Sequence, residues 1–299
     1  MHKLLTAGLL LLLLVPHASA ISEEALLDSI QRTSFAYFWN EANPSNGLVK
    51  DRDTGGSPAS IASVGFGLSA ICVAIDHGWI TRSQGVDRVL TTLQTFWTCP
   101  QNASADSACG YRGLFYHFLD MNTGLRAWSS ELSTIDTGLL FAGILHAREY
   151  FDTNDSLDIE IRAIADSITQ RAEWDFTWTG GGIKMGWTPE TGFNGFGEWV
   201  GYNEAMIMYI IAFGSPTHPV PGVAWNTWTN NYFWGSHYGY QYVEFPPLFG
   251  HQYSHCWIDF RNIHDTYMQN KGITYFENSR RATLAQRAYC IDNPGNQIG

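Results

Sequence analysis

The sequence predicts an all-α fold, a barrel of helical hairpins with short β-hairpins in the loops at one rim. Two observations lead to this prediction. The helical segments alternate along the chain between runs with one apolar stripe and runs that are apolar on nearly every side. The loops that lead into the apolar runs are long, whereas the loops that leave them are short. The apolar helices would therefore line the barrel, and all the long loops would meet at one rim, where function usually lies.

Each element follows from its own pattern. Striped helices are expected at residues 23–39, 81–97 and 157–174, and apolar ones at 61–75, 132–145 and 205–213. Ser22 is a good N-cap for the helix at 23–39 and Asn203 for the helix at 205–213, and Gly214 is a good C-terminal end for the latter helix. Further helices are expected near residues 224–234, 252–269 and 275–291, and a β-hairpin near residues 113–119 and 126–128.

The first twenty residues have the organisation of a signal peptide. Lys3 precedes an apolar core at residues 4–15, and Ala18-Ser19-Ala20 is a small-residue cleavage site. We expect cleavage after Ala20, a periplasmic or secreted protein, and one domain over residues 21–299. No later segment is long and apolar enough to span a membrane.

Charge and aromatic content favour a sugar ligand. The chain has 17 Lys and Arg against 28 Asp and Glu, for a net charge of −11, which argues against nucleic acid as a partner. Aromatic residues make up 14%, with 12 Trp and 14 Tyr. Their flat rings and polar groups suit pyranose faces and hydroxyls.

The cysteines and histidines predict one disulfide and no metal. Cys99 and Cys109 bracket a polar loop that gains from being tied down, so we expect them to pair. Cys72 reads as a core thiol, whereas Cys256 and Cys290 either pair or stay free. His251 and His255 are four residues apart, but no third ligand accompanies them, so we expect neither a metal nor another cofactor.

Glu204 is the central candidate. It stands at the start of the apolar helix 205–213, after a segment (180–199) rich in Gly and aromatic residues. A carboxylate in this position either contacts a sugar or only interacts favourably with the helix dipole. Glu131 and Asp136 are the other two catalytic candidates and flank the entry to another apolar helix. An unpaired charge is costly there, so Asp136 meets either a sugar hydroxyl or a salt-bridge partner.

The remaining candidates would bind substrate at the same rim, and we expect His251 to open into one cavity with Glu204 and Asp136. Asp51 and Arg52 end the first long loop and either contact a glucose unit or pair with each other. One further set consists of polar side chains that either bind sugar or are hydrogen-bonded in the core: Asn203, His251, Gln252, Tyr253 and His255. A second set consists of aromatic rings that either stack on sugar or belong to the core: Trp128, Trp187, Trp199, Tyr202 and Phe249.

Several longer runs carry a family resemblance. They lie at residues 57–67, 111–118, 130–137, 201–206 (GYNEAM), 214–219, 246–255 (PPLFGHQYSH) and 275–281. In these runs the chain resembles the glycoamylase-like domain family, whose characterised bacterial members include β-1,2-glucan hydrolases of glycoside hydrolase family 144. The resemblance covers essentially residues 35–294.

The resemblance implies an (α/α)6 barrel and an inverting glycosidase that acts on a glucan oligosaccharide or polysaccharide, β-1,2-glucan first. Glu204 matches the acid position of the family motif. The family's domain continues beyond the position of Gly299 and carries its general base there. Because the sequence predicts roughly nine helices and six hairpins need twelve, we expect the domain to lack its C-terminal helices and to have little activity by itself.

Two other functions remain open. One is a non-catalytic or vestigial carbohydrate-binding protein, which would lack a second carboxylate facing Glu204. The other is a polysaccharide lyase on the same type of barrel. A lyase needs cations for uronate carboxylates, and the rim loops offer chiefly Arg52, Arg112, Arg126 and Lys184.

Overall fold

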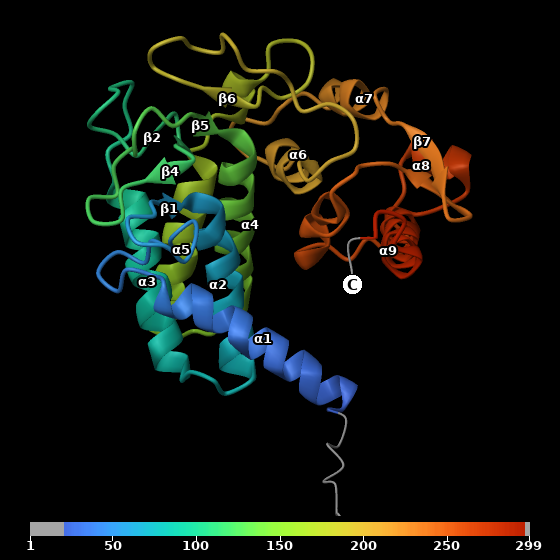
Figure 1. The fold of residues 1–299 in the computed structure, drawn as a ribbon. Helices are drawn as coiled ribbons and strands as arrows, with labels where there is room; N and C mark the ends of the chain where they lie inside the picture. Colours follow the sequence, from blue (N-terminus) through green and yellow to red (C-terminus); the bar gives the residue numbers. More distant parts are fainter. Residues whose placement is uncertain (1–20, 297–299) are drawn as a thin grey trace, which may run out of the picture.

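The computed structural model describes residues 21–296, which form helical hairpins with alternating inner and outer helices (Figure 1). The predicted signal peptide, residues 1–20, lies outside the described residues. The outer helices are α1 (Glu23–Asn40), α3 (Arg82–Thr98) and α5 (Ser156–Gln170), and the inner helices are α2 (Ile61–Asp76), α4 (Thr134–Tyr150) and α6 (Met206–Phe213). The predicted all-α fold and its alternation of helices are confirmed.

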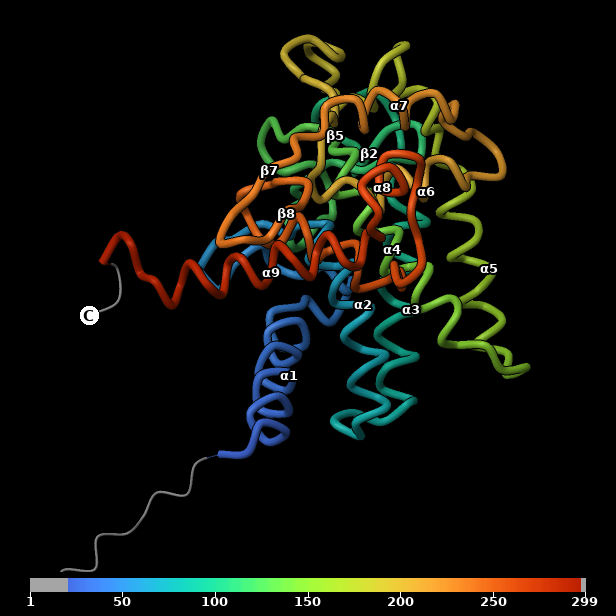
Figure 2. Tube along the Cα trace, turned by 90° about the vertical axis from the view of Figure 1, so that its right-hand side faces the viewer, coloured from blue at the N-terminus to red at the C-terminus, as the bar shows by residue number. Residues whose placement is uncertain are grey.

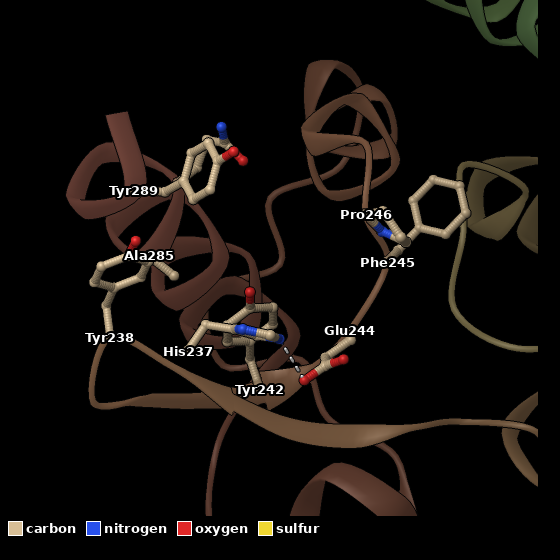
Figure 3. Close-up of a pocket in the computed structure, with 9 residues that line it drawn as sticks. His237, Tyr238, Tyr242, Glu244, Phe245, Pro246, Ala285 and Tyr289 are labelled. Carbon is tan, nitrogen blue, oxygen red and sulfur yellow. Dashed lines mark ion pairs between the residues drawn. The ribbon is translucent and has the colours of Figure 1, made fainter. Parts of the chain in front are cut away.

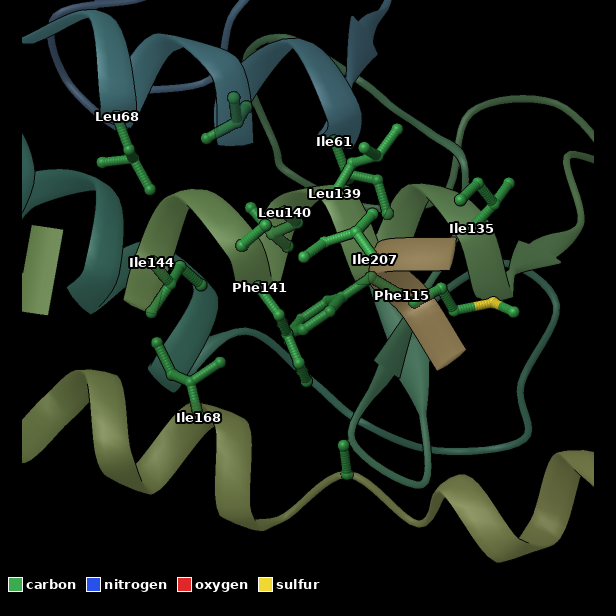
Figure 4. Close-up of a cluster of buried hydrophobic side chains, with 14 of the residues drawn as sticks. Ile61, Leu68, Phe115, Ile135, Leu139, Leu140, Phe141, Ile144, Ile168 and Ile207 are labelled. Atoms are coloured by element: carbon green, nitrogen blue, oxygen red, sulfur yellow. The ribbon is translucent and has the colours of Figure 1, made fainter. Parts of the chain in front are cut away.

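The inner helices pack closely because glycines lie at their contacts. A methyl group placed on Gly143 of α4 would lie 1.9 Å from the carbonyl oxygen of Gly65 in α2. Gly138 of α4 packs in the same way against Met208 of α6. Around these contacts the apolar side chains of several elements form one core (Figure 4), including Leu68, Phe115, Leu140, Phe141, Ile168 and Ile207. Helix α4 is therefore buried on nearly all sides.

The outer helices cover this layer unequally. α3 and α5 are joined by an ion pair between Arg82 and the fully buried Asp158, with 2.7 Å between Nη2 and Oδ2. The N-terminal half of α1, by contrast, exposes Leu26, Leu27 and Ile30, and only Phe35 near its other end is buried. The apolar stripe predicted for α1 thus covers the core only at the C-terminal end of the helix.

Short antiparallel strand pairs gather at one end of helices α2 to α5 (Figure 1). They are β1 (Ala59–Ser60) with β4 (Phe118–Leu119), β2 (Gly110–Tyr111) with β3 (Leu114–Phe115), and β5 (Leu132–Ser133) with β6 (Gly186–Trp187). In the predicted hairpin, Leu119 also bridges to Arg126. The predicted disulfide between Cys99 and Cys109 is confirmed and closes the loop between α3 and β2. The long loops therefore meet at one rim, as expected.

The last third of the described chain begins with α7 (Val223–Thr229) and the hairpin of β7 (Trp234–His237) and β8 (Tyr240–Val243). The 3-10 turns η2 (Leu248–His251) and η3 (Tyr253–Cys256), the short α8 (Thr266–Lys271) and α9 (Tyr275–Asp292) follow. Helix α9 crosses beside the β7–β8 hairpin (Figure 2).

The continuous helix predicted at residues 252–269 is wrong. Asp259 Oδ1 accepts a hydrogen bond from the backbone N–H of Arg261 at 3.0 Å, and Asn262 has a φ of 65°. Such local side-chain bonds compete with helical hydrogen bonding, and a left-handed residue ends a helix.

Two smaller differences concern helix boundaries. Helix α5 ends at Gln170, ahead of a separate 3-10 turn, η1 (Trp174–Thr177), and α6 begins only at Met206.

Cys72 is buried as predicted. Cys256 and Cys290, for which pairing and free thiols were both open, are free and exposed. Within residues 21–296, none of the helices combines the length and the hydropathy that a membrane crossing requires.

Candidate active site

Glu204 lies in a tight turn just before α6. The turn starts at Gly201, whose φ of 76° favours glycine and whose N–H donates to the carbonyl oxygen of Trp228 at 3.0 Å. The buried Asn203 closes it, because its Oδ1 accepts from the N–H of Ala205 at 2.9 Å and its Nδ2 donates to the carbonyl oxygen of Gly201 at 3.0 Å. Asn203 therefore shapes the turn that presents Glu204 and, contrary to prediction, is not the N-cap of α6.

The environment of Glu204 favours a protonated carboxyl group. Its Oε2 atom is buried and has no hydrogen-bond partner among the described residues. Burial raises the pKa of Glu204, its own backbone N–H lowers that pKa in part, and the charge of Asp136 raises it further. The net shift is upward, so the influence of burial exceeds that of the local backbone dipoles.

A cavity of about 550 Å³ connects Glu204 to several other candidates. It lies at the rim where the inner helices begin. The side chains that line it and that matter for chemistry are three further carboxylates, one histidine and five aromatic rings: Asp51, Glu131 and Asp136; His117; Phe66, Phe196, Trp199, Phe249 and Tyr253.

Asp136 projects into this cavity from the first turn of α4. Ser133, the N-cap of that helix, accepts a hydrogen bond from the N–H of Asp136 at 3.2 Å and donates its hydroxyl to Oδ2 of Asp136 at 2.5 Å. The Asp136 side chain is only 13% exposed. Burial raises the pKa of Asp136, and the nearby His117 and the Ser133 hydroxyl offset this only in part.

His117 joins two of these carboxylates. Its Nδ1 lies 2.9 Å from Oε1 of Glu131 and its Nε2 lies 3.6 Å from Oδ2 of Asp136. Burial lowers the pKa of His117, but the hydrogen bond to Glu131 and the charges of Asp136, Glu131 and Asp51 raise it by more. For Glu131, burial raises the pKa, but its partner His117 and its own backbone N–H lower it by more.

His117 is not among the residues that the sequence pattern singles out. In the sequence, only its place in the run 111–118 points to His117. Its pairing with Glu131 and Asp136 arises because a loop residue meets the start of α4, which the sequence does not show. Within residues 21–296, His117, Glu131 and Asp136 are also the group whose ligand atoms, all within 4.8 Å, could hold a metal ion. Each of the three already has a hydrogen-bond or ion-pair partner in the structure. His251 and His255 belong to no such group in the described part of the chain.

Four of the predicted substrate-binding residues line the cavity with Glu204, namely Asp51, Trp199, Phe249 and Tyr253. Trp199 is held by a hydrogen bond from its Nε1 to Oγ1 of Thr134 at 3.1 Å. Phe249 is 38% exposed, and its ring centroid lies 5.1 Å from that of Tyr253. The structure therefore brings aromatic faces next to the carboxylates.

Arg52 and Trp128 line a second cavity of about 340 Å³, which shares Asp51 with the first. Trp187 lines neither cavity and instead stacks on Tyr111, with 4.9 Å between ring centroids. The sequence leaves two roles open for Trp187, stacking on sugar or packing in the core. In the structure its ring packs the loops around residues 111 and 187 against each other.

Tyr202, His251, Gln252 and His255 lie away from the Glu204 cavity. Tyr202 is buried, stacks on His251 at 4.7 Å, and shares a hydrogen bond of 3.2 Å with Ser279 of α9. His251 is 1% exposed, and burial lowers its pKa to about 4. His251, Gln252 and His255 line a separate cavity of about 310 Å³ against α9. The expectation that His251 opens into one cavity with Glu204 and Asp136 is therefore wrong, because residues 248–256 form two 3-10 turns and no continuous helix.

A further cavity of about 350 Å³ lies between the β7–β8 hairpin and α9 (Figure 3). His237 Nε2 lies 2.8 Å from Oε1 of Glu244 on its wall, and Tyr238, Tyr242 and Tyr289 supply rings. None of the predicted site residues lines it.

The basic side chains of the rim are engaged in ion pairs. Arg52 pairs with Asp51 at 2.8 Å, Arg126 with Glu190 at 2.7 Å, and Lys184 with Glu198 at 3.1 Å. Arg112 pairs with Glu173. These four cations are therefore balanced by carboxylates of the protein.

Comparison with known proteins gives relatives over most of the chain. The Glycoamylase family model, described as "Putative glucoamylase", matches residues 197–297. An exo β-1,2-glucooligosaccharide sophorohydrolase (non-reducing end) from Parabacteroides distasonis is 26% identical over 93% of this chain. The chain spans 42% of the length of that relative.

Two solved structures share the fold. A protein from Bacteroides uniformis, described as a putative glucoamylase, is 30% identical with a TM-score of 0.82, and the match covers 93% of this chain and 69% of that one. A β-1,2-glucanase from Parabacteroides distasonis is 25% identical with a TM-score of 0.82, and the match covers 93% of this chain and 43% of that one. With its inner and outer helices arranged as an α/α toroid, this chain belongs to the glycoamylase-like domain family.

Proposed function

We propose that this protein is a glycoside hydrolase of β-linked glucan, with β-1,2-glucan as its preferred substrate, and that it acts in the periplasm or after secretion. The observation that carries the proposal is the carboxyl group of Glu204 in a cavity of about 550 Å³. Its Oε2 is buried and has no hydrogen-bond partner within residues 21–296, and its pKa is raised. The names of the similar sophorohydrolase and β-1,2-glucanase support the linkage. The organisation of residues 1–20 supports the location.

Glu204 is the proposed general acid. Inverting hydrolysis needs a protonated carboxyl that gives its proton to the leaving glycosidic oxygen. Burial raises the pKa of Glu204, and because Asp136 lines the same cavity, ionisation of Glu204 would place two negative charges near each other, which raises this pKa further. The unpartnered Oε2 leaves that atom free to meet a substrate oxygen.

Asp136 and Glu131 are proposed to bind and orient glucosyl hydroxyls. Both carboxylates are fixed, Asp136 by Ser133 and Glu131 by His117, so their free lone pairs point in set directions. The rings of Trp199, Phe249 and Tyr253 offer apolar faces to the pyranose units.

A non-catalytic carbohydrate-binding role is the second candidate. One observation favours it, since the other carboxylates of the cavity are engaged, Asp51 with Arg52 and Glu131 with His117. A polysaccharide lyase has less support, because the four rim cations are already paired with carboxylates.

The test is to incubate the mature chain and its Glu204→Gln variant with β-1,2-glucan, starch and a uronate polymer, and to analyse binding and products. Reducing sugar from β-1,2-glucan that is lost in the variant supports the hydrolase. Binding of β-1,2-glucan with equal lack of turnover in both proteins supports the binding role. Reducing sugar from starch alone, or unsaturated uronate products, would contradict the proposed substrate.

A further inference from the structure

Trp128 is held in an unusual position at the rim. Trp128 is 71% exposed, which is the highest value among the exposed large hydrophobic residues of the described part of the chain. Its backbone φ of 53° lies in the left-handed region, which is unfavourable for a bulky residue. Exposure of an indole and a strained backbone both cost free energy, so the position calls for a compensating role.

The turn around Trp128 is rigid. The N–H of Ala127 donates to the carbonyl oxygen of Phe118 at 2.9 Å, and the hydroxyl of Ser130 donates to the same oxygen at 3.2 Å. The N–H of Ser130 closes the turn onto the carbonyl oxygen of Ala127 at 3.2 Å. The Trp128 ring packs edge-on against Phe118, with 5.8 Å between centroids. Trp128 is therefore a platform on a hydrogen-bonded turn, and most of its indole is open to solvent.

This platform forms one wall of a cavity of about 340 Å³, the Trp128 pocket, lined by Asp51, Arg52, Thr54, Gly55, Gly56, Ser57, Pro58, Phe118 and Trp128. The loop opposite Trp128 is ordered by its own hydrogen bonds. The N–H of Asp51 donates to the carbonyl oxygen of Pro58 at 2.8 Å, and the N–H of Arg52 donates to Oγ of Ser57 at 3.2 Å. Both sides of the pocket are thus set before a ligand arrives.

The Trp128 pocket adjoins the cavity of Glu204. Asp51 lines both cavities. His117 of the Glu204 cavity stacks on Phe118 of the Trp128 pocket, with 3.8 Å between ring centroids. A ligand that extends from Glu204 past His117 would therefore meet Phe118, Asp51 and then Trp128.

The chemistry of the pocket suits one pyranose unit. The open indole face matches the apolar face of the sugar ring. The Asp51 carboxylate accepts hydroxyl hydrogens, and Arg52, whose side chain is 71% exposed, keeps guanidinium N–H groups beyond those that bind Asp51. Because the two charges cancel, the pocket favours a neutral polar ligand over an anion.

We propose that the Trp128 pocket is a distal sugar subsite that binds a glucosyl unit away from the scissile bond of the same chain. The proposal rests on the proposed glucan function. It implies that the protein selects substrates by length, because only a chain long enough to reach from Glu204 to Trp128 gains the second contact.

The test measures binding by calorimetry in the Glu204→Gln background, with β-1,2-glucooligosaccharides of increasing length from the disaccharide upwards. Trp128→Ala should lower the affinity for the longer oligosaccharides by roughly tenfold and leave that for the disaccharide unchanged. Trp128→Phe, which keeps an aromatic face, should retain most of the affinity. Phe233→Ala is the matched control, because Phe233 is 67% exposed and lines neither cavity.

Equal losses at every length, no loss at all, or the same loss in Phe233→Ala would overturn the subsite. The same series with α-1,4-glucooligosaccharides separates this outcome from failure of the proposed function. If only the α-1,4 series binds and still depends on Trp128 and on length, the β-1,2 assignment fails and the subsite stands. If the β-1,2 series binds without any dependence on Trp128, the function stands and the subsite fails.

Discussion

The imidazole Nδ1 of His117 lies 2.9 Å from Oε1 of Glu131, on the wall of the cavity that Glu204 shares. The other nitrogen of the same ring faces Asp136 at 3.6 Å. A protonated His117 therefore compensates two carboxylates at once. Such a group links the stability of the site to pH.

His117→Gln should remove a pH dependence from the stability of the protein. The pKa of His117 is raised in the fold, where burial is outweighed by Glu131 and by the charges of Asp136 and Asp51. A raised pKa contributes stability that is fully present below the ordinary histidine value of about 6.5 and is lost as pH rises through the folded value. Wild type should therefore lose roughly 1 kcal/mol of unfolding free energy over this rise, a figure reduced for partial exposure.

Urea unfolding at intervals from mildly acidic to mildly alkaline pH checks this prediction. His218→Gln is the control, because His218 also faces a carboxylate, Asp175 at 3.5 Å, but lies outside the Glu204 cavity. A slope that persists unchanged in His117→Gln would contradict the assigned role of His117.

Glu204→Gln should stabilise the protein at neutral pH while it removes hydrolysis. The pKa of Glu204 is raised by burial and by the charge of Asp136. The stability linked to this proton is complete below the ordinary carboxyl range and is lost as pH rises through the raised pKa. Glutamine mimics the protonated form at every pH. At pH 7 we expect a gain of about 1 kcal/mol, or a Tm increase of roughly 2–4 °C, which disappears as the pH falls towards about 4.

The same variant should lower any turnover by at least about 100-fold, because a general acid contributes on that scale. Differential scanning calorimetry at both pH values, with Glu149→Gln as an exposed control, checks the stability part. A variant that is less stable at neutral pH would show that the fold lowers the pKa of Glu204 and favours its ionised form.

The fold could be predicted from the sequence where burial alone decides the pattern. Helices α2, α4 and α6 are buried on most sides, and their composition shows this directly. Residues 252–269 could not be predicted in this way, because the hydrogen bond from Arg261 to Asp259 and the left-handed Asn262 interrupt a run of mixed polar and apolar residues. There a local side-chain bond outweighs helical periodicity.

The site was predictable only in part, because its members come from separate loops. Glu204, Asp136 and Glu131 stand at the starts of inner helices. Because these starts are expected to share one rim of the barrel, the sequence predicts that the three residues lie together. The pairing of His117 with Glu131 depends on how the loop after β3 folds over the start of α4, and no spacing along the chain records it. Tyr202 and Trp187 carry the same ring chemistry as Trp199, but packing against His251 and Tyr111 directs them elsewhere.

Gly65→Ala should destabilise the protein strongly, whereas Gly67→Ala in the same helix should not. A methyl group on Gly65 would lie 2.2 Å from the carbonyl oxygen of Leu139, which is backbone and cannot move aside. One on Gly67 would lie 3.4 Å from Cγ2 of Val49, an ordinary contact. We expect Gly65→Ala to cost roughly 1–3 kcal/mol through overpacking, and Gly67→Ala to be neutral or to gain up to about 1 kcal/mol from helix propensity.

Thermal unfolding of the two variants beside wild type measures the difference directly. Because α2 and α4 both line the cavity, through Phe66 and Asp136, the strain of Gly65→Ala should also weaken glucan binding, while Gly67→Ala should bind as wild type does. Equal Tm values for the two variants would show that α2 and α4 do not make this close backbone contact.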